Sequence, residues 1–444
     1  MPSTVHPNPV SPSTSFEQKV SKAGMFPFRL LLVLASFFLT VLLYIDRACI
    51  STAKGPIIKA LNLDADGIQF GLIMAAFTLG YALLQAPTGS LADKFGSRRV
   101  ITGIVLVWSI LTAVTGGAFN YLSMLVTRFL FGAGEAGCFP ALSKVAFYWF
   151  PVKERGIIQG INFSGSRIGA AAALPLAAAM IGSLGWRVTF FIFGIAGLVF
   201  AGLWFWLFVD KPEESTRISD AEKKYICENR QQVTAAKSIM PYGKVLASKN
   251  MWLAMVQYIC SNFTFYFTLS WMYPFIKKSF TTLDPVQAGF FAAAPLVAGA
   301  IGNWVSGYMV DSIYKNGRFA ESRRIPAIIG FVLSAIGMYM VIQFPNSLAL
   351  TVTFLSLAVL GADMTLSPSW SFCIDIAKKN SGVVSGTMNM AGNIGAFVTI
   401  IAFPYLLKWT GSPKPFFYIC CALSVLAVFL WTMMDPEKPI QAEA

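Results

Sequence analysis

Histidine is almost absent from this 444-residue sequence, and its absence removes several classes of function. The single histidine, His6, lies in an N-terminal stretch rich in Ser, Pro and Thr. A Ser-His hydrolase, a His-ligated zinc site and a His-based proton relay each need a histidine beside other reactive groups. We therefore expect no metal ion, no cofactor and no enzymatic activity, and we expect carboxylates to carry any titration near neutral pH.

Charged residues are also scarce, at 12% of the chain against 56% hydrophobic residues. Soluble domains carry about 25% charged residues. The seven cysteines have no CxxC spacing and fit neither a metal site nor a disulfide framework. The net charge of +13 is spread over short clusters between apolar segments, which argues against a nucleic-acid partner. The composition predicts a polytopic protein embedded in a lipid bilayer.

Long apolar segments supply the transmembrane helices that this composition requires. A helix needs about 20 residues to cross the hydrocarbon core. Twelve segments have this length, at about 28–54, 66–91, 99–118, 120–149, 155–183, 186–210, 250–275, 284–311, 324–345, 347–375, 380–410 and 414–434. The sequence therefore predicts an all-α membrane protein with twelve transmembrane helices.

The longest polar loop, 211–249, divides these segments into two sets of six. The predicted domains are a cytoplasmic tail at 1–27, a six-helix bundle at 28–210, a cytoplasmic linker at 211–249, a second bundle at 250–434 and a cytoplasmic tail at 435–444. Lys and Arg are concentrated on the side that this topology places in the cytoplasm, as the positive-inside rule requires. In the linker, Ser219 to Glu222 resembles a capping box ahead of a short helix near 220–230.

A Gly-Asp pattern recurs in the two halves. Gly89 and Asp93 follow the second span, and Gly307 and Asp311 follow the eighth, an offset of about 218 residues. Duplicated halves place a binding site at their interface near the bilayer midplane. Gly permits close backbone approach, and Asp can pair with an arginine or accept hydrogen bonds from a helix N-terminus. Such contacts can gate transport if they form in only one state of the protein. The alternative is that these segments are runs of solvated charged residues with no gating role.

The loop after the second span resembles the signature loop of the major facilitator superfamily, with the pattern Gly89-x-Leu91-x-Asp93-x-x-Gly96-x-Arg98-Arg99. With twelve spans, this resemblance covers nearly the whole chain and implies two pseudo-symmetric six-helix halves. Three further stretches narrow the resemblance to one family within this superfamily: Tyr44-x-Asp46-Arg47, Arg128 to Glu135, and Trp149-Phe150-Pro151-x-x-Glu154-Arg155. Together they are similar to the anion:cation symporter family, whose bacterial members carry galactonate, glucarate, hexuronates and related organic acids with protons.

An acid and a base stand side by side at the end of the first apolar run, at Asp46 and Arg47. Charges inside a span are costly unless they pair or face a wet cavity, which favours function over a helix end in the headgroup region. The two side chains point about 100° apart, so one can face a cavity while the other faces a neighbour. Arg128 and Glu135 share one face of the fourth span, about 10 Å apart. A structural ion pair between helices is the alternative for these two residues.

The resemblance implies roles for these four residues. Asp46 and Glu135 would carry protons, and Arg47 and Arg128 would bind the substrate anion. An anion that takes the arginine deprives the carboxylate of its partner in a low-dielectric site, which favours protonation and couples proton to solute. Further substrate-site candidates match the family pattern: Tyr44, Tyr81, Ser369, Trp370 and Asn389, with Asn393 as an additional possibility. For Trp370, core packing is the alternative, and for Asn389 an interhelix hydrogen bond.

The fifth span departs from the sugar-acid pattern, because Ser166 and Arg167 stand where a glutamine is usual. The added cation suits a dianion such as an aldarate or a phosphate ester, or it neutralises a neighbour. Asp363 lies in the tenth span, close to where the repeat places the counterpart of Glu135. It is either a third proton site or a hydrogen-bonded structural acid, and the second interpretation is slightly favoured.

The resemblance to this family implies proton-coupled symport of a small organic anion, with a sugar acid (an aldonate, aldarate or hexuronate) favoured, by alternating access. An anion exchanger, or a transporter of phosphate or another carboxylate, is the alternative within the family. A membrane anion sensor that does not transport is the alternative of another class, and the short linker argues against it. We expect a monomer in the bacterial inner membrane with both termini cytoplasmic, and no partners beyond anion, protons and lipid.

Overall fold

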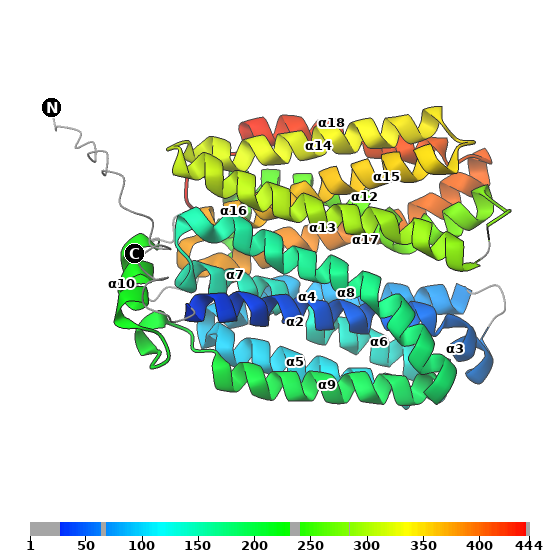
Figure 1. Cartoon of the computed structure of the whole chain (residues 1–444), viewed down its shortest axis with the longest axis horizontal. Helices are drawn as coiled ribbons and strands as arrows, with labels where there is room; N and C mark the ends of the chain where they lie inside the picture. Colours follow the sequence, from blue (N-terminus) through cyan, green and yellow to red (C-terminus); the bar gives the residue numbers. More distant parts are fainter. Residues whose placement is uncertain (1–26, 64–67, 231–239, 284, 441–444) are drawn as a thin grey trace.

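The computed structural model describes residues 27–63, 68–230, 240–283 and 285–440, which form helices joined by loops, with no strand among them. The helices run mostly along the long axis of the molecule (Figure 1). His6, nearly all of the tail expected at 1–27, the first residues of the spans expected at 66–91 and 284–311, and the last four residues lie outside the described ranges.

The first half contains α2 (Phe28–Thr52), α3 (Lys54–Ala60), α4 (Ile68–Phe95), α5 (Ser97–Gly116), α6 (Tyr121–Glu135), α7 (Cys138–Trp149), α8 (Arg155–Leu184) and α9 (Trp186–Leu207). Helix α2 packs along α8, α5 along α9, and α4 along α6. The short helices α10 (Asp220–Asn229) and α11 (Tyr242–Ala247) follow in the linker.

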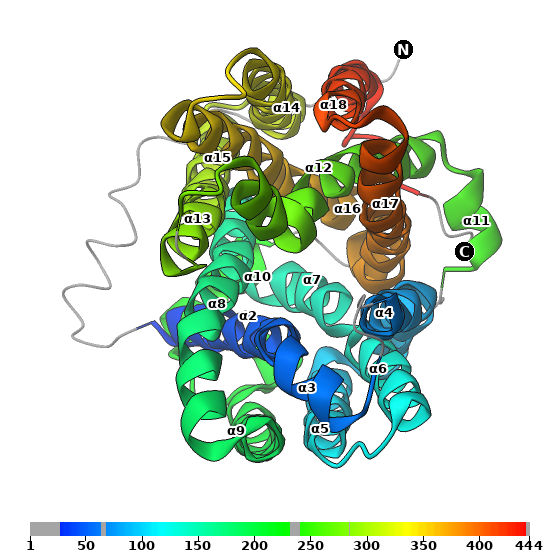
Figure 2. The same cartoon turned by 90° about the vertical axis from the view of Figure 1, so that its right-hand side faces the viewer.

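The second half contains α12 (Lys249–Ser279), α13 (Pro285–Lys315), α14 (Phe319–Gln343), α15 (Leu348–Met364), α16 (Leu366–Ala377), α17 (Ser381–Thr410) and α18 (Lys414–Met433). Viewed end-on, the two halves lie side by side, with α7 and α16 near the centre (Figure 2). Two long contacts join the halves, α8 against α13 and α4 against α17.

Helix α5 illustrates why these segments are transmembrane helices. Its buried residues recur every three or four positions, at Ile101, Val105, Trp108 and Thr112. The opposite face exposes large apolar side chains, namely Leu106, Val107 and Ile110. A helix that is apolar all round, with one face packed against other helices, is suited to a lipid environment.

Eight of the described helical segments are long and apolar enough to cross a membrane, and a ninth is the bent helix α4. The remaining crossings are α6 with α7, α8 and α12, which carry many of the polar side chains described below. Counting α6 with α7 and α15 with α16 as single crossings gives the twelve that the sequence predicts.

Two spans that the sequence analysis treated as continuous are broken. The span at 120–149 divides into α6 and α7, and the span at 347–375 divides at Thr365 into α15 and α16. Pro140 and Pro368 each lie in the first turn after the break. Because proline has no N–H, residues 136 and 364 each lose the helical hydrogen bond that their carbonyl groups would otherwise accept. Proline also accounts for α4, which bends by 46° between Gln69–Gln85 and Pro87–Phe95.

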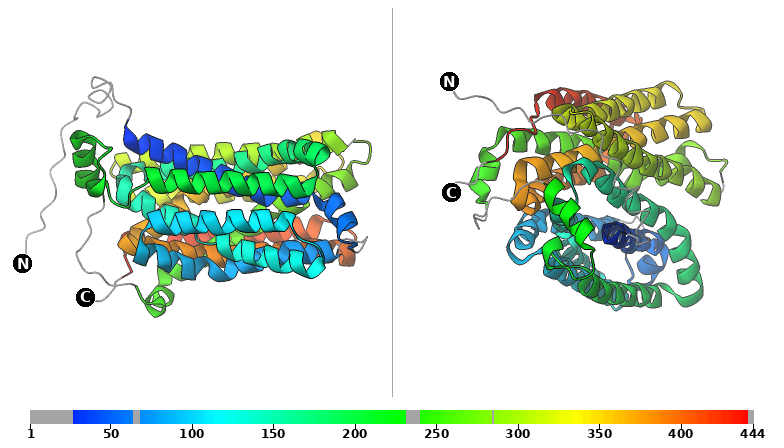
Figure 3. Two further views of the ribbon diagram at one scale, coloured as in Figure 1. Left: turned by 90° about the horizontal axis from the view of Figure 1, so that it is seen from below. Right: turned by 60° about the vertical axis from the view of Figure 1, so that its left-hand side comes forward.

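The linker helix α10 lies across one end of the bundle, here called the linker end (Figures 1 and 3). Ser219 caps α10 as predicted, accepting a hydrogen bond from the Glu222 N–H at 3.2 Å. The carboxylate of Glu222 does not complete a capping box. It accepts hydrogen bonds from the backbone N–H groups of Phe28 and Arg29, at 3.0 and 2.9 Å, and so caps the start of α2. Burial and a hydrogen bond donated to Glu154 raise the pKa of the Tyr225 phenol on the same helix.

Candidate functional site

At the linker end, Asp93 joins α4 of the first half to α17 of the second. Its carboxylate accepts hydrogen bonds from the N–H groups of Gly382, at 3.2 Å, and Val383, at 2.9 Å, in the first turn of α17. Lys144 Nζ lies 3.7 Å from the same carboxylate. Gly89 permits this approach, because a Cβ there would lie 2.2 Å from the Gly382 carbonyl oxygen.

The second half repeats this arrangement in the opposite direction. Asp311, at the end of α13, accepts hydrogen bonds from the N–H groups of Gly156 and Ile157 in the first turn of α8, each at 2.8 Å. A Cβ at Gly307 would lie 2.7 Å from the Gly156 carbonyl oxygen. The sequence analysis left two partners open for the repeated aspartates, an arginine or a helix N-terminus. In both halves the aspartate accepts hydrogen bonds from a helix N-terminus.

The other signature residues act within the first half. Gly96 begins the turn into α5 with a φ of 86°, and a Cβ there would meet the Asp210 carboxylate at 2.3 Å. Arg98 donates its backbone N–H to Asp210 at 3.0 Å and its guanidinium to the Phe205 carbonyl at 2.9 and 2.7 Å. Arg99 is exposed. Arg98 therefore ties α5 to the end of α9.

A buried ion-pair network that the sequence analysis did not single out also joins the halves at the linker end. Asp375, on α16, accepts hydrogen bonds from Arg155 Nη1 at 3.0 Å and from Arg323 Nε at 2.8 Å. Arg155 opens α8 in the first half, whereas Arg323 lies on α14 in the second. All three side chains are almost completely buried.

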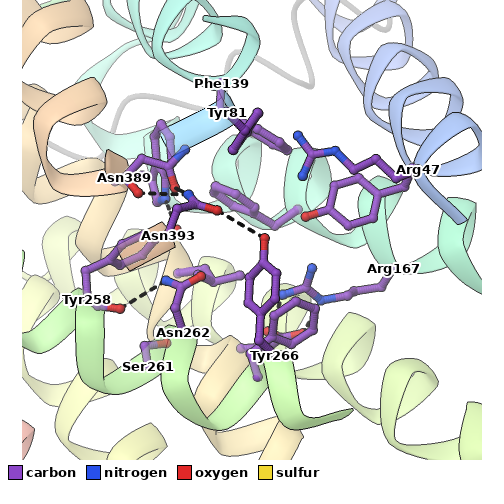
Figure 4. Close-up of a pocket in the computed structure, with 16 residues that line it drawn as sticks. Arg47, Tyr81, Phe139, Arg167, Tyr258, Ser261, Asn262, Tyr266, Asn389 and Asn393 are labelled. Atoms are coloured by element: carbon purple, nitrogen blue, oxygen red, sulfur yellow. Dashed lines mark hydrogen bonds and ion pairs between the residues drawn. The ribbon is translucent and has the colours of Figure 1, made fainter. Parts of the chain in front are cut away.

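A cavity lies between the two halves (Figure 4). Helices α2, α4, α7 and α8 form one side, and helices α12, α15, α16 and α17 form the other. Its wall comprises Tyr44, Arg47, Tyr81, Phe139, Phe163, Arg167, Tyr258, Ser261, Asn262, Phe265, Tyr266, Asp363, Leu366, Trp370, Asn389 and Asn393.

Arg47 lines this cavity in an aromatic setting. Its guanidinium carbon lies 4.2 Å from the ring centroid of Tyr81, 4.9 Å from that of Tyr44 and 5.3 Å from that of Phe77. Its Nε donates a hydrogen bond of 2.9 Å to Glu135, which ends helix α6. An arginine stacked on aromatic faces is weakly hydrated and holds its donors in a fixed plane. Arg47 is thus a preorganised donor at the cavity wall.

Three other predicted charges, Asp46, Arg128 and Glu135, do not line the cavity. Asp46 is buried and accepts a long hydrogen bond of 3.5 Å from Thr112 Oγ1. Arg128 is buried against the rings of Phe131 and Phe77, at 4.4 and 5.2 Å. Asp46 and Arg128 are close enough to Glu135 to interact electrostatically. The angular separation of Asp46 and Arg47 thus places Arg47 at the cavity and Asp46 toward α5.

Arg167 and Asp363 form an ion pair at the cavity wall. Arg167 Nε and Nη2 donate hydrogen bonds to the two carboxylate oxygens of Asp363, each at 2.6 Å. The guanidinium carbon of Arg167 lies 3.6 Å from the ring centroid of Phe265. Arg167 belongs to the first half and Asp363 to the second, so this pair crosses the interface. Ser166 accepts a hydrogen bond from Arg167 at 3.2 Å but does not line the cavity.

The second half contributes an aromatic and amide surface to the cavity. Trp370 lines it and donates its indole N–H to the Tyr258 hydroxyl at 2.9 Å. Asn389 and Asn393 both line it, and Asn393 accepts a hydrogen bond from Tyr266 at 3.1 Å.

Ser369 is not brought to the cavity. It neighbours Trp370 on helix α16, about 100° around the helix axis. Its hydroxyl is buried against Gln257 at 3.1 Å inside the second half.

Sequence reasoning missed the polar residues of α12 that line the cavity. Tyr258, Ser261, Asn262 and Tyr266 recur at intervals that place them on one face of an otherwise apolar helix. This spacing was available in the sequence and would have identified the face.

Comparisons with known proteins agree with this architecture. The family model described as Major Facilitator Superfamily matches residues 36–400 and, in an overlapping match, residues 316–444. The probable sulfoacetate transporter of Cupriavidus necator is 32% identical over 406 residues, covering 89% of this chain and 92% of the relative. The probable galactarate/D-glucarate transporter of Escherichia coli K12 is 30% identical over 432 residues, covering 92% and 96%.

Solved structures show the same fold. The proton:xylose symporter XylE bound to 6-bromo-6-deoxy-D-glucose superimposes with a TM-score of 0.70 at 16% identity, covering 91% of this chain and 95% of that one. The human organic anion transporter MFSD10 gives a TM-score of 0.71 at 14% identity, covering 92% and 100%. The family match, the identity to these relatives and the paired six-helix halves lead to one conclusion. The chain belongs to the Major Facilitator Superfamily and is a multi-pass membrane transporter, not an enzyme.

Proposed function

We propose that this transporter carries a small organic anion together with protons, and that the cavity between the halves is its binding site. The observation that carries the proposal is the pairing of Arg47, on the cavity wall, with the buried carboxylate of Glu135. A substrate anion competes with Glu135 for this guanidinium. A carboxylate that loses its partner in a buried site is stabilised by taking up a proton, which links the two binding events.

The relatives support an organic acid as the solute. Their names specify sulfoacetate and galactarate or D-glucarate. The cavity wall suits a hydroxylated carbon chain, because Asn262 and Asn389 offer amide groups and Tyr258 and Tyr266 offer hydroxyls. Trp370 presents an apolar face to the C–H edge of a sugar acid.

Asp46 and Arg128 form the supporting charges in this proposal. Asp46 serves as a second proton site, and Arg128 balances the two buried acids from behind the aromatic wall. Asp93 and Asp311 close the linker end in one state of the cycle. This end faces the cytoplasm of a bacterium with an inner membrane, as the positive-inside rule favours, and the monomer is the working unit.

Proteoliposome uptake tests the proposal. Labelled sulfoacetate, galactarate, D-glucarate and galactonate are offered with and without an inward proton gradient, which supplies about 1.4 kcal/mol per proton for each tenfold difference. We expect uphill uptake of at least one of them by the wild type. Glu135→Gln should retain exchange of internal for external anion but lose the response to the gradient. Glu321→Gln, which removes a carboxylate from the surface, is the matched control.

Each other result has a defined meaning. Concentrative uptake by Glu135→Gln would remove Glu135 as the coupling site. Wild-type uptake that requires internal anion and ignores the pH gradient would favour an exchanger. Binding without any flux would favour an anion sensor.

A further inference from the structure

The Arg167–Asp363 pair is the feature of the cavity that the proposed function leaves unused. Both side chains lie on the cavity wall, and their two hydrogen bonds of 2.6 Å have the bidentate geometry of an arginine bound to a carboxylate. The pair also crosses between the halves. Asp363 thus presents to Arg167 the same chemical group that an organic acid would present.

We propose that Arg167 is a second anion-binding group, that Asp363 occupies it in the empty carrier in place of a substrate anion, and that the preferred solute is therefore a small dianion. This inference rests on the proposed function and specifies its substrate class. One anionic group of the solute binds Arg47, and the other displaces Asp363 from Arg167.

The two arginines of the cavity have parallel environments. Arg47 donates to Glu135 and lies over the ring of Tyr81, and Arg167 donates to Asp363 and lies over the ring of Phe265. Each guanidinium therefore has one carboxylate partner and at least one aromatic ring beside it. Such sites favour the planar, bidentate recognition of a carboxylate, and a sulfonate offers oxygen acceptors of the same charge.

The two acids also occupy comparable places in the repeated halves. Glu135 is the last residue of α6, directly before the break in the fourth span. Asp363 is the penultimate residue of α15, directly before the break in the tenth span. The pairs differ in one respect, because Arg47–Glu135 lies within the first half whereas Arg167–Asp363 joins the halves. Displacement of Asp363 therefore releases an interhalf contact at the moment when the solute binds.

The surroundings of Asp363 are built to hold its carboxylate beside the cavity. A Cβ at Gly299 would lie 2.2 Å from Asp363 Oδ2. The carboxylate therefore fits here only because residue 299 is a glycine and has no side chain. Among the described residues, the other hydrogen-bond donor to the carboxylate is Asn303 Nδ2, at 3.5 Å from Oδ2. Such a long contact is weak. Arg167 is thus the principal partner of Asp363, and an external anion that replaces this carboxylate on the guanidinium has few other contacts to break.

A matched pair of solutes tests the inference by binding to the purified full-length protein. Galactarate and galactonate share a six-carbon skeleton, but galactarate carries two carboxylates and galactonate one. Isothermal titration calorimetry should show that the wild type binds galactarate at least about tenfold more tightly than galactonate. This is the difference in affinity expected for one additional charge-assisted hydrogen-bonded group. The double variant Arg167→Gln/Asp363→Asn removes both charges, so it leaves no unpaired buried ion. It should bind the two solutes about equally.

The single variant Asp363→Asn separates displacement from a purely structural role. Removing the internal competitor should tighten galactarate binding, whereas loss of a structural ion pair would weaken or not change it. The double variant Arg318→Gln/Glu321→Gln neutralises an exposed ion pair and should preserve the wild-type preference.

The possible failures are distinguishable. Proton-driven uptake of galactonate equal to that of galactarate would keep the proposed function and overturn this inference. Retention of the galactarate preference in Arg167→Gln/Asp363→Asn would overturn it as well. Absence of binding and uptake for both solutes and for sulfoacetate would refute the proposed function and this inference together.

Discussion

Arg47 shows at the scale of one residue how a charge can be stable and available inside a membrane protein. Glu135 neutralises it from one side, and the rings of Tyr44 and Tyr81 cover its faces. A guanidinium suits this site because its planar charge stacks on the rings while its edge donates hydrogen bonds. A compact, strongly hydrated ammonium also donates hydrogen bonds, but it cannot stack as a plane on the rings or present two parallel donors along one edge.

We therefore expect Arg47→Lys to fold and to keep the ion pair with Glu135, but to bind organic anions about tenfold to a hundredfold more weakly, the range expected for one or two lost charge-assisted hydrogen bonds. Calorimetry on the purified variant measures this change. Arg187→Lys is the control, because Arg187 donates to the carbonyl groups of Gly116 and Ala118, away from the cavity. Equal affinities of wild type and Arg47→Lys would show that Arg47 does not contact the anion.

The residues of the site could be predicted from the sequence only in part. Charges inside apolar runs singled out Arg47 and Glu135, but the sequence did not determine which of Asp46 and Arg47 faces the cavity. It also put Ser369 with Trp370, although these neighbours point into different surroundings. The orientation of each helix about its own axis depends on packing against helices distant in sequence, which local patterns do not encode.

At the scale of the elements, the two aspartates at the linker end make equivalent contacts. Asp93 accepts from the first turn of α17, and Asp311 accepts from the first turn of α8. A carboxylate at a helix N-terminus satisfies unpaired N–H groups and interacts favourably with the helix dipole. Each half therefore caps a helix of the other, and the two caps act in parallel.

Replacing one aspartate should loosen only its own cap. We expect Asp93→Asn to increase amide hydrogen exchange at residues 382–383 but not at 156–157, and Asp311→Asn to do the reverse, because an amide side chain lacks the charge and one of the acceptors. Each loss is worth about 0.3–2 kcal/mol, or up to about thirtyfold in exchange. Asp220→Asn, in the linker helix, is the control. Unchanged exchange in both variants would show that the caps do not hold this end closed.

Local chemistry accounts for most of the elements. Apolar length predicted the crossings, and Ser219 marked the start of α10. The breaks before Pro140 and Pro368 carried a signal of their own, because proline removes a helical hydrogen bond four residues earlier. The cap that Glu222 provides to α2 had no such signal, since it depends on tertiary contact between segments almost two hundred residues apart.

At the scale of the whole molecule, the contacts between halves suggest one state of a transport cycle. Hydrogen bonds and ion pairs across the interface in the described residues include those of Asp93, Asp311 and Asp375 at the linker end and of Arg167 at the cavity. Alternating access requires the linker-end contacts to separate while the opposite end closes. The architecture of two halves was predictable from hydropathy and the internal repeat. The state was not, because one sequence encodes every state of the cycle.

Distances between spin labels should reveal the opening of the linker end and the closing of the opposite end. In a variant with its native cysteines replaced by alanine, one label pair is placed at the linker end, at Lys94 and Lys315, and another at the opposite end, at Phe119 and Trp409. All four positions are exposed. Adding galactarate at acidic pH should lengthen the first distance and shorten the second in part of the population. Changes of the same sign at both ends, or no change, would contradict a rocking movement of the halves.

The charges around the cavity have an electrical consequence. Asp46, Glu135 and Asp363 balance Arg47, Arg128 and Arg167, so the empty site carries no net charge when all six are ionised. Moving a charge across a membrane potential changes the free energy by about 2.3 kcal/mol per 100 mV. The membrane potential does not change the free energy of moving a neutral empty site. The same holds for a loaded site if each anionic group of the solute binds together with one proton. Accumulation would then follow the pH difference and be almost independent of the voltage.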